Sequence, residues 1–113
     1  MVYDKARELA NMLSQSDEYV SYKAAQDKAF ANETTKSLLK EYAKLRVQAQ
    51  GAIVSGKKDD ASLERLQKIG EILQLDQDAS AYLIAEYRLN TMLGDVYKIL
   101  AEAIQVDFGF GED

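Results

Sequence analysis

The sequence predicts an all-α protein of about five helices, an antiparallel helical bundle with a long C-terminal helix. None of its 113 residues is proline, the commonest helix breaker. Apolar residues recur three and four positions apart along most of the chain, which is the period of a helix with one buried side. The composition agrees, because 47% hydrophobic residues can form a core and 29% charged residues can solvate a surface.

The first two helices are expected on either side of a polar interruption at Ser16. A first helix is expected from about Val2 to Leu13, and its inner side would hold Tyr3, Ala6, Leu9, Ala10 and Leu13. Ser16 can cap a second helix that runs to about Ala31, because the two acidic residues after it stabilise a first turn. The inner side of this second helix would hold Tyr19, Tyr22, Gln26, Ala29 and Phe30.

The third helix is expected from the cap residue Asn32 to about Ser55. Its apolar side alternates three and four, through Leu38, Tyr42, Leu45, Ala49 and Ala52. Gly51 disfavours helix by about 1 kcal/mol and is predicted to mark a bend or a close contact with another helix. Gly56 suits the left-handed residue that ends a helix.

The loop from Gly56 to Asp60 precedes a fourth helix, which either Asp60 or Ser62 can cap. Its inner side would hold Leu63, Leu66, Ile69, Gly70 and Leu73. Because the loop is short, the third and fourth helices are expected to pack as an antiparallel hairpin.

The fifth helix is expected from about Ala79 to Gln105, with Asp76 and Asp78 as two possible caps. One apolar stripe contains Tyr82, Ala85, Leu89, Met92, Val96, Ile99, Ala103 and Val106. A neighbouring stripe contains Ala79, Leu83, Glu86, Asn90, Leu93, Tyr97, Leu100 and Ile104. The helix is either surrounded by the rest of a monomer or turns one stripe toward another subunit or partner. The second alternative is favoured, since a chain this short has little material to cover a long helix.

The domain prediction is a single helical domain over residues 1–105 and a flexible C-terminal tail over residues 106–113. Gly109 and Gly111 give the tail low helix propensity.

Absent residue types exclude most chemistry. The chain has no histidine, the usual acid–base group near neutral pH, and no cysteine, a leading nucleophile and soft-metal ligand. We therefore expect no enzyme, no catalytic residue, no metal site and no cofactor.

A net charge of −5 argues against broad binding of nucleic acid or of membranes. The first residues lack the layout of a signal peptide, and a cytoplasmic location is expected.

An alternative function is RNA binding through one face of the third helix. Lys36, Lys40 and Lys44 form a row at intervals of four residues, and such a row can contact phosphates. The acidic balance of the chain favours a solvated helix face instead. RNA binding that weakens as salt rises would support the alternative.

The order of these features resembles the YlbF/YmcA family of small bacterial helical regulators. The resemblance runs from about Leu9 to Ile104. It rests on residues 9–10, 16–19, 22, 31–33, 38–42, 81–89 and 92–96 together with the loop at Gly56. It implies a non-enzymatic protein that self-associates or pairs with a paralogue. It also implies an accessory complex linked to ribonuclease Y and mRNA processing, and thereby to competence, biofilm formation and sporulation. UPF-type helical proteins of unknown function are the main competitor within the same fold.

Some family members carry cysteines that serve an iron–sulfur cluster. This chain has no cysteine, so the cofactor is not expected here. The expected contacts are with proteins, in a homo-oligomer or in a hetero-oligomer with a paralogue. The residues predicted to make them are Tyr42, Leu45, Leu89, Met92, Leu93, Val96, Tyr97, Leu100 and Ile104.

Overall fold

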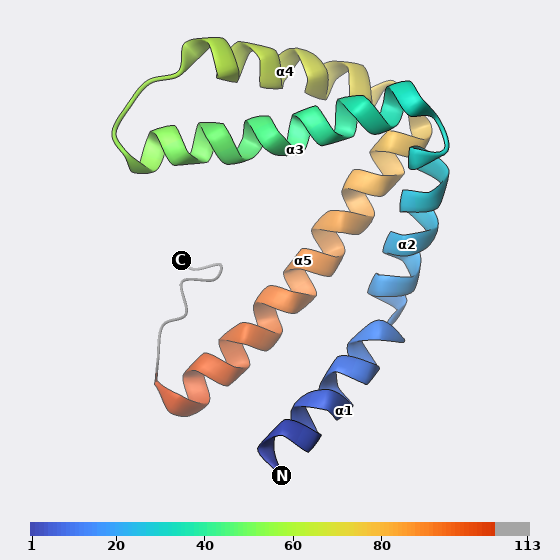
Figure 1. Ribbon diagram of the computed structural model, residues 1–113, viewed down its shortest axis with the longest axis vertical. Helices are drawn as coiled ribbons and strands as arrows, with labels where there is room; N and C mark the ends of the chain where they lie inside the picture. The colour runs from blue at the N-terminus through green and yellow to red at the C-terminus, as the bar shows by residue number, and fades with distance from the viewer. Residues whose placement is uncertain (106–113) are drawn as a thin grey trace. The chain divides into compact units, whose positions relative to one another are not determined.

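The computed structural model describes residues 1–105, which form five α-helices joined by short turns (Figure 1). The helices are α1 (Val2–Ser14), α2 (Asp17–Phe30), α3 (Glu33–Val54), α4 (Asp60–Gln74) and α5 (Gln77–Ile104). The predicted all-α class, the number of helices and the long last helix are confirmed. The predicted tail, residues 106–113, lies outside the described residues.

The chain divides into two compact units, which are described one at a time. The first unit combines Met1–Ala24 with the chain from Leu83 onward, and the second unit is Ala25–Tyr82. The single domain over residues 1–105 stays a prediction.

Two helix starts form at the residues that the sequence indicates. The backbone N–H of Tyr19 donates to the hydroxyl of Ser16 at 3.2 Å, at the start of α2. The backbone N–H of Thr35 donates to the amide oxygen of Asn32 at 3.1 Å, at the start of α3. Each bond satisfies an N–H that has no partner inside its own helix.

The end of α3 depends on Gly56, as predicted. Its φ of +74° is in the left-handed region that glycine adopts without steric cost. The N–H of Gly56 donates to the carbonyl of Ile53 at 3.1 Å, and that of Lys57 to the carbonyl of Ala52 at 2.8 Å. These two bonds are the Schellman arrangement, which stops the helix and reverses the chain toward α4.

The start of α4 differs from the prediction by one residue, because Asp59 is the cap in place of Asp60 or Ser62. Its carboxylate accepts the backbone N–H of Ser62 at 3.2 Å and the Ser62 hydroxyl at 2.7 Å. The hydroxyl bond, more than any other interaction, holds the pKa of Asp59 below its ordinary value. The backbone carbonyl of Asp59 also accepts the N–H of Leu63, so the hydrogen bonding of α4 begins one residue earlier than expected.

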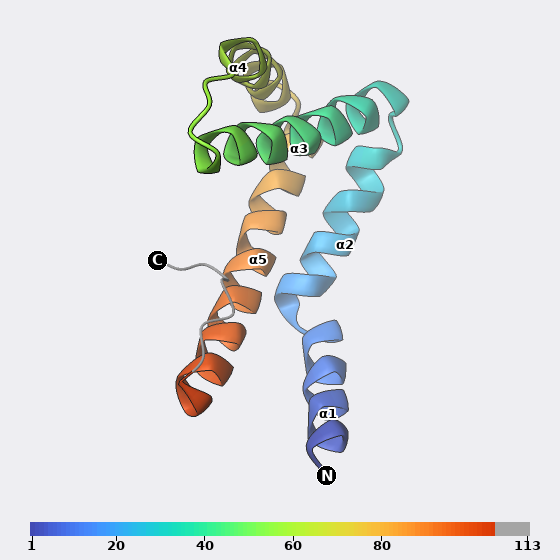
Figure 2. The same ribbon diagram turned by 60° about the vertical axis from the view of Figure 1, so that its left-hand side comes forward.

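The second unit is built on the predicted hairpin of α3 and α4, which lie side by side in both views (Figures 1 and 2). Its largest fully buried side chains are Ile69 and Leu73 of α4. Leu39, Leu45 and Ala49 of α3 are buried in the same unit. The period of three and four therefore placed the core of the hairpin correctly, although it missed Leu39.

Two details of the hairpin contradict the sequence analysis. Leu63, predicted to face inward, is 45% exposed, because two helices alone cover little of each other near the loop. A Cβ built on Gly51 meets nothing within 4 Å among residues 1–105, so of the two alternatives predicted for Gly51, a bend or a close helix contact, the close contact is wrong. The close contact is at Gly70 instead, where a Cβ would lie 3.4 Å from the Tyr42 ring.

Asp76 joins the start of α5 to the start of α3 within the second unit. Its carboxylate accepts the N–H of Asp78 at 3.0 Å and that of Ala79 at 3.2 Å, so Asp76 is the cap and α5 begins at Gln77. The hydroxyl of Thr35, 6% exposed, donates to the other carboxylate oxygen at 2.8 Å. This hydroxyl bond, followed by the bond from Ala79, lowers the pKa of Asp76.

Glu41 and Arg65 link the outer sides of α3 and α4. The guanidinium donates two hydrogen bonds to the carboxylate, at 3.0 and 3.1 Å. These bonds lower the pKa of Glu41 and raise the pKa of Arg65. Because both side chains are solvent-exposed, the pair fixes the alignment of the hairpin more than it stabilises it.

Candidate protein-interaction surface

The first unit leaves much of its apolar surface uncovered. No residue of α1 is buried, and Tyr3 and Met12 are 77% and 68% exposed. The predicted inner side of α1 is therefore wrong at Tyr3, Ala6 and Ala10, whereas Leu9 and Leu13 are half-buried. The apolar side of α1 is therefore not buried in a core, although an amphipathic helix normally buries that side.

Along α5 the cover decreases toward the C-terminal end. Ala85 is 8% exposed, and the next residues on that side, Leu89, Met92 and Val96, are half-buried. Leu100 and Ile104 are 46% and 60% exposed. Residues 1–105 therefore leave the apolar side chains of the last turns of α5 largely uncovered.

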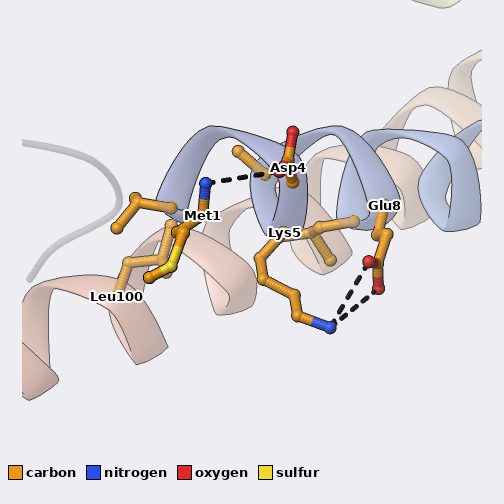
Figure 3. Close-up of a pocket in the computed structure, with 8 residues that line it drawn as sticks. Met1, Asp4, Lys5, Glu8 and Leu100 are labelled. Carbon is orange, nitrogen blue, oxygen red and sulfur yellow. Dashed lines mark hydrogen bonds and ion pairs between the residues drawn. The ribbon is translucent and has the colours of Figure 1, made fainter.

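An apolar groove lies between α1 and the last turns of α5. Its volume is about 770 Å³, within the range of pockets that bind ligands or side chains. Figure 3 shows the Met1 side chain extending from α1 toward Leu100 of α5. The apolar residues that line it are Met1, Val2, Ala6, Leu9 and Leu100. We call this feature the α1–α5 groove.

Charged side chains of α1 border the α1–α5 groove. The ammonium of Lys5 pairs with the carboxylate of Glu8 at 3.3 Å, and Asp4 lies one turn before Glu8 (Figure 3). Both partners of the pair are largely exposed, so the pair contributes little to stability. An apolar floor with a charged border is the usual composition of a protein interface.

The predicted interaction residues fall into two groups. Leu45 is part of the core of the second unit, and Tyr42 packs there against Gly70 with the Arg46 guanidinium 5.1 Å from its ring centre. The seven others are on the α5 segment of the first unit. Of these, Leu89, Met92, Leu93 and Val96 are half-buried, and Tyr97, Leu100 and Ile104 are exposed. Their role in an interface stays a prediction.

The sequence analysis missed the contribution of α1 to this surface. It treated the apolar residues of α1 as one side of a core helix, because the period of three and four is the same for a core and for an interface. Only the absence of buried residues in α1 distinguishes the two.

The lysine row of α3 is not uniform. The ammonium of Lys36 lies 6.0 Å from the centre of the Phe30 ring and the side chain is half-buried, whereas Lys40 and Lys44 are exposed. RNA binding by this row stays a prediction.

Within residues 1–105, no three acidic side chains are grouped so that they could hold a metal ion. Each helix in the same range falls short of the length and apolar character needed to cross a bilayer.

Known proteins match this fold and sequence over nearly the whole described chain. Residues 2–105 match the family described as "Control of competence regulator ComK, YlbF/YmcA". The chain belongs to the YlbF/YmcA family. The resemblance noted in the sequence is thus confirmed.

Relatives named UPF0342 proteins are also similar in sequence. One from Halothermothrix orenii is 36% identical over 106 residues, which cover 93% of this chain and 90% of the relative. The UPF0342 protein STH1710 from Symbiobacterium thermophilum is 36% identical over 110 residues, covering 96% and 98%. The UPF-type proteins, which the sequence analysis named as an alternative to the YlbF/YmcA resemblance, are therefore relatives of this chain.

A solved structure shares the fold. It is the crystal structure of Bacillus subtilis RicA in complex with RicF, with a TM-score of 0.61 and 20% identity. The match covers 92% of this chain and 93% of that chain. At this identity the likeness establishes the helical fold and leaves function to other arguments.

Proposed function

We propose that this protein is a non-enzymatic, cytoplasmic regulatory adaptor that binds other proteins through the α1–α5 groove. The observation that carries the proposal is the uncovered apolar surface of α1 and of the last turns of α5. Water contact with such a surface is unfavourable, at roughly 25 cal/mol per Å² of apolar area, so covering it by a partner stabilises a complex. Membership of a family of competence regulators supports a regulatory role.

The partner class that fits the groove best is an amphipathic helix of a paralogue from the same family. A groove between two helices accepts the apolar side of a third helix, with anchors spaced three and four residues apart. The fold neighbour RicA was solved as a complex with RicF, which supports pairing between proteins. We further propose, as the family resemblance implies, that the complex acts with ribonuclease Y in mRNA processing, and thereby in competence, biofilm formation and sporulation.

Affinity capture with two single variants tests this function. Leu100→Asp places a charge in the groove, whereas Ile99→Asp places the same charge on the preceding residue, which is 65% exposed and does not line the groove. We expect Leu100→Asp to reduce recovery of the paralogue and of ribonuclease Y from the native cell by about tenfold or more, and Ile99→Asp to leave it close to wild type.

The measurement is quantitative mass spectrometry of captured proteins, with circular dichroism to show that both variants keep their helices. Equal recovery with both variants would rule out the groove as the docking surface. Capture that lacks both a paralogue and ribonuclease Y in the wild type would contradict the proposed complex.

A further inference from the structure

The α1–α5 groove is suited to apolar groups more than to charged ones. The charges of α1 are paired with each other, because Lys5 lies 3.3 Å from Glu8. In the same way, Arg7 lies 3.7 Å from Asp4. The lining is aliphatic apart from the thioether of Met1, which makes favourable contacts with aromatic rings. A segment with aromatic side chains and no basic residue therefore fits this groove.

Such a segment follows α5 directly in the sequence. Residues 106–113 lie outside the described residues and contain two of the three phenylalanines of the chain. Apolar side chains occupy every second position at its start, in Val106, Phe108 and Phe110. Side chains two positions apart in an extended segment point to the same side. Both phenylalanines can therefore enter one groove together.

The groove is within reach of this segment. Leu100 lines the groove and precedes Gln105 by five residues, which is about 7.5 Å along the helix. Three extended residues carry the chain from Gln105 to Phe108 over as much as roughly 10 Å, and two more carry it to Phe110 at roughly 16 Å. These lengths cover both the return to Leu100 and the separation of about 8–10 Å between two packed helices.

The backbone at Gln105 ends α5 with a turn. Its φ of +55° is in the left-handed region, which costs a non-glycine residue about 1–2 kcal/mol. Among residues 1–105, no other non-glycine residue has a positive φ. A left-handed residue after the last helical turn directs the chain away from the helix axis, as Gly56 does at the end of α3. The chain therefore does not continue along α5 beyond Ile104.

The free energy of docking is close to balanced, which suits an occupant that a partner can displace. Burying two phenylalanine side chains contributes roughly 3–6 kcal/mol. Fixing the backbone of the three residues that carry them, 108–110, costs about 1–2 kcal/mol each, which is a similar total. Because the segment is tethered beside the groove, docking within one chain does not depend on the protein concentration.

We propose that residues 106–113 bind in the α1–α5 groove of the same chain, with Phe108 and Phe110 against Leu9 and Leu100. The groove then has an internal occupant, which competes with a protein partner for the same apolar surface. The competition rests on the proposed function of the groove, whereas the docking does not.

A single tryptophan tests the docking, because the chain contains none. In Phe108→Trp the indole takes the place of the phenylalanine ring, and quenching by acrylamide measures its exposure. With the docked and free states in balance, the quenching constant should be about half of the value measured after Leu100→Asp is added. Adding Ile99→Asp instead should leave the constant unchanged, since Ile99 does not line the groove.

A second groove variant and a dilution series accompany this comparison. Ala6→Asp charges the α1 side of the groove at an exposed position, so it should raise the quenching constant as Leu100→Asp does, at little cost to the fold. Dilution from high to low micromolar concentration should leave the constant of Phe108→Trp unchanged. A constant that neither groove variant raises, or one that rises on dilution, would overturn the docking.

Capture of the paralogue from the native cell tests the competition. Phe108→Ser combined with Phe110→Ser should raise its recovery by about twofold, because these changes free a groove that is otherwise occupied half of the time. Gly109→Ser combined with Gly111→Ser is the matched control, since it adds the same residue type to the same segment and keeps both phenylalanines. Equal recovery with the two double variants would overturn the competition. A failure of the proposed function is a different result, in which Leu100→Asp recovers as much paralogue as the wild type.

Discussion

Replacing Ile69 with alanine is expected to lower the free energy of unfolding by about 2–4 kcal/mol. Ile69 is 0% exposed and is one of the two largest fully buried side chains in residues 1–105. Removing its outer carbons loses their burial and leaves a cavity that the hairpin of α3 and α4 can fill only in part. Since about 1 kcal/mol shifts the melting temperature by roughly 4–8 °C in a domain of this size, we expect a decrease of about 10 °C or more.

Ile72 provides the matched control for this prediction. It is the same residue type on the same helix, but it is 50% exposed. Ile72→Ala should change the free energy of unfolding by less than about 1 kcal/mol. Urea denaturation followed by circular dichroism measures both variants. Similar losses in the two would mean that Ile69 does not occupy the core of the second unit.

Replacing Asp76 with alanine is expected to lower the free energy of unfolding by about 2 kcal/mol. The substitution removes the cap of α5, which is typically worth about 1 kcal/mol. It also leaves the buried hydroxyl of Thr35 without its acceptor, a cost of similar size. Asp78→Ala is the control, because Asp78 is also an acidic residue in the first turn but is exposed. We expect it to cost less than half as much in thermal melts.

Asp76 also makes the free energy of unfolding depend on pH. Its pKa in the folded protein is lowered from the ordinary value of 3.8, mainly by the Thr35 hydroxyl. The ionised form therefore stabilises the fold fully above that ordinary value, and this contribution is lost as the pH falls through the lowered pKa. Asp76→Asn, which does not titrate, should differ from wild type at pH 7 and approach it in melts at pH 3 or below. A difference that stays constant over this range would contradict the link.

Helix ends were the part of the fold that the sequence predicted best. Ser16, Asn32 and Gly56 each act where expected, because capping bonds and left-handed turns depend on residues within one turn of each other. The shift from Asp60 to Asp59 shows the limit of this reasoning. Two adjacent aspartates have the same chemistry, and only the backbone path decides which carboxylate meets the N–H of Ser62.

Contacts between distant residues were not predictable in the same way. The bond from Thr35 to Asp76 spans 41 residues, and neither side chain is unusual in its local sequence. Gly51 and Gly70 look alike as helix glycines, yet only Gly70 lies against another side chain, that of Tyr42. Such pairings depend on how α3 and α4 align, which no local pattern encodes.

The candidate site also combines features that local sequence determines with features that depend on the whole fold. The sequence by itself determined the five helices, most of their ends and the spacing of their apolar residues, because these follow from local hydrogen bonding and from a period of about 3.6 residues. Only the tertiary structure decided which apolar sides are covered: Leu73 is 1% exposed, whereas Leu100 is 46% exposed, although both occupy the apolar side of a helix. Burial requires a second surface at the right distance, and the position of that surface is a property of the folded chain as a whole.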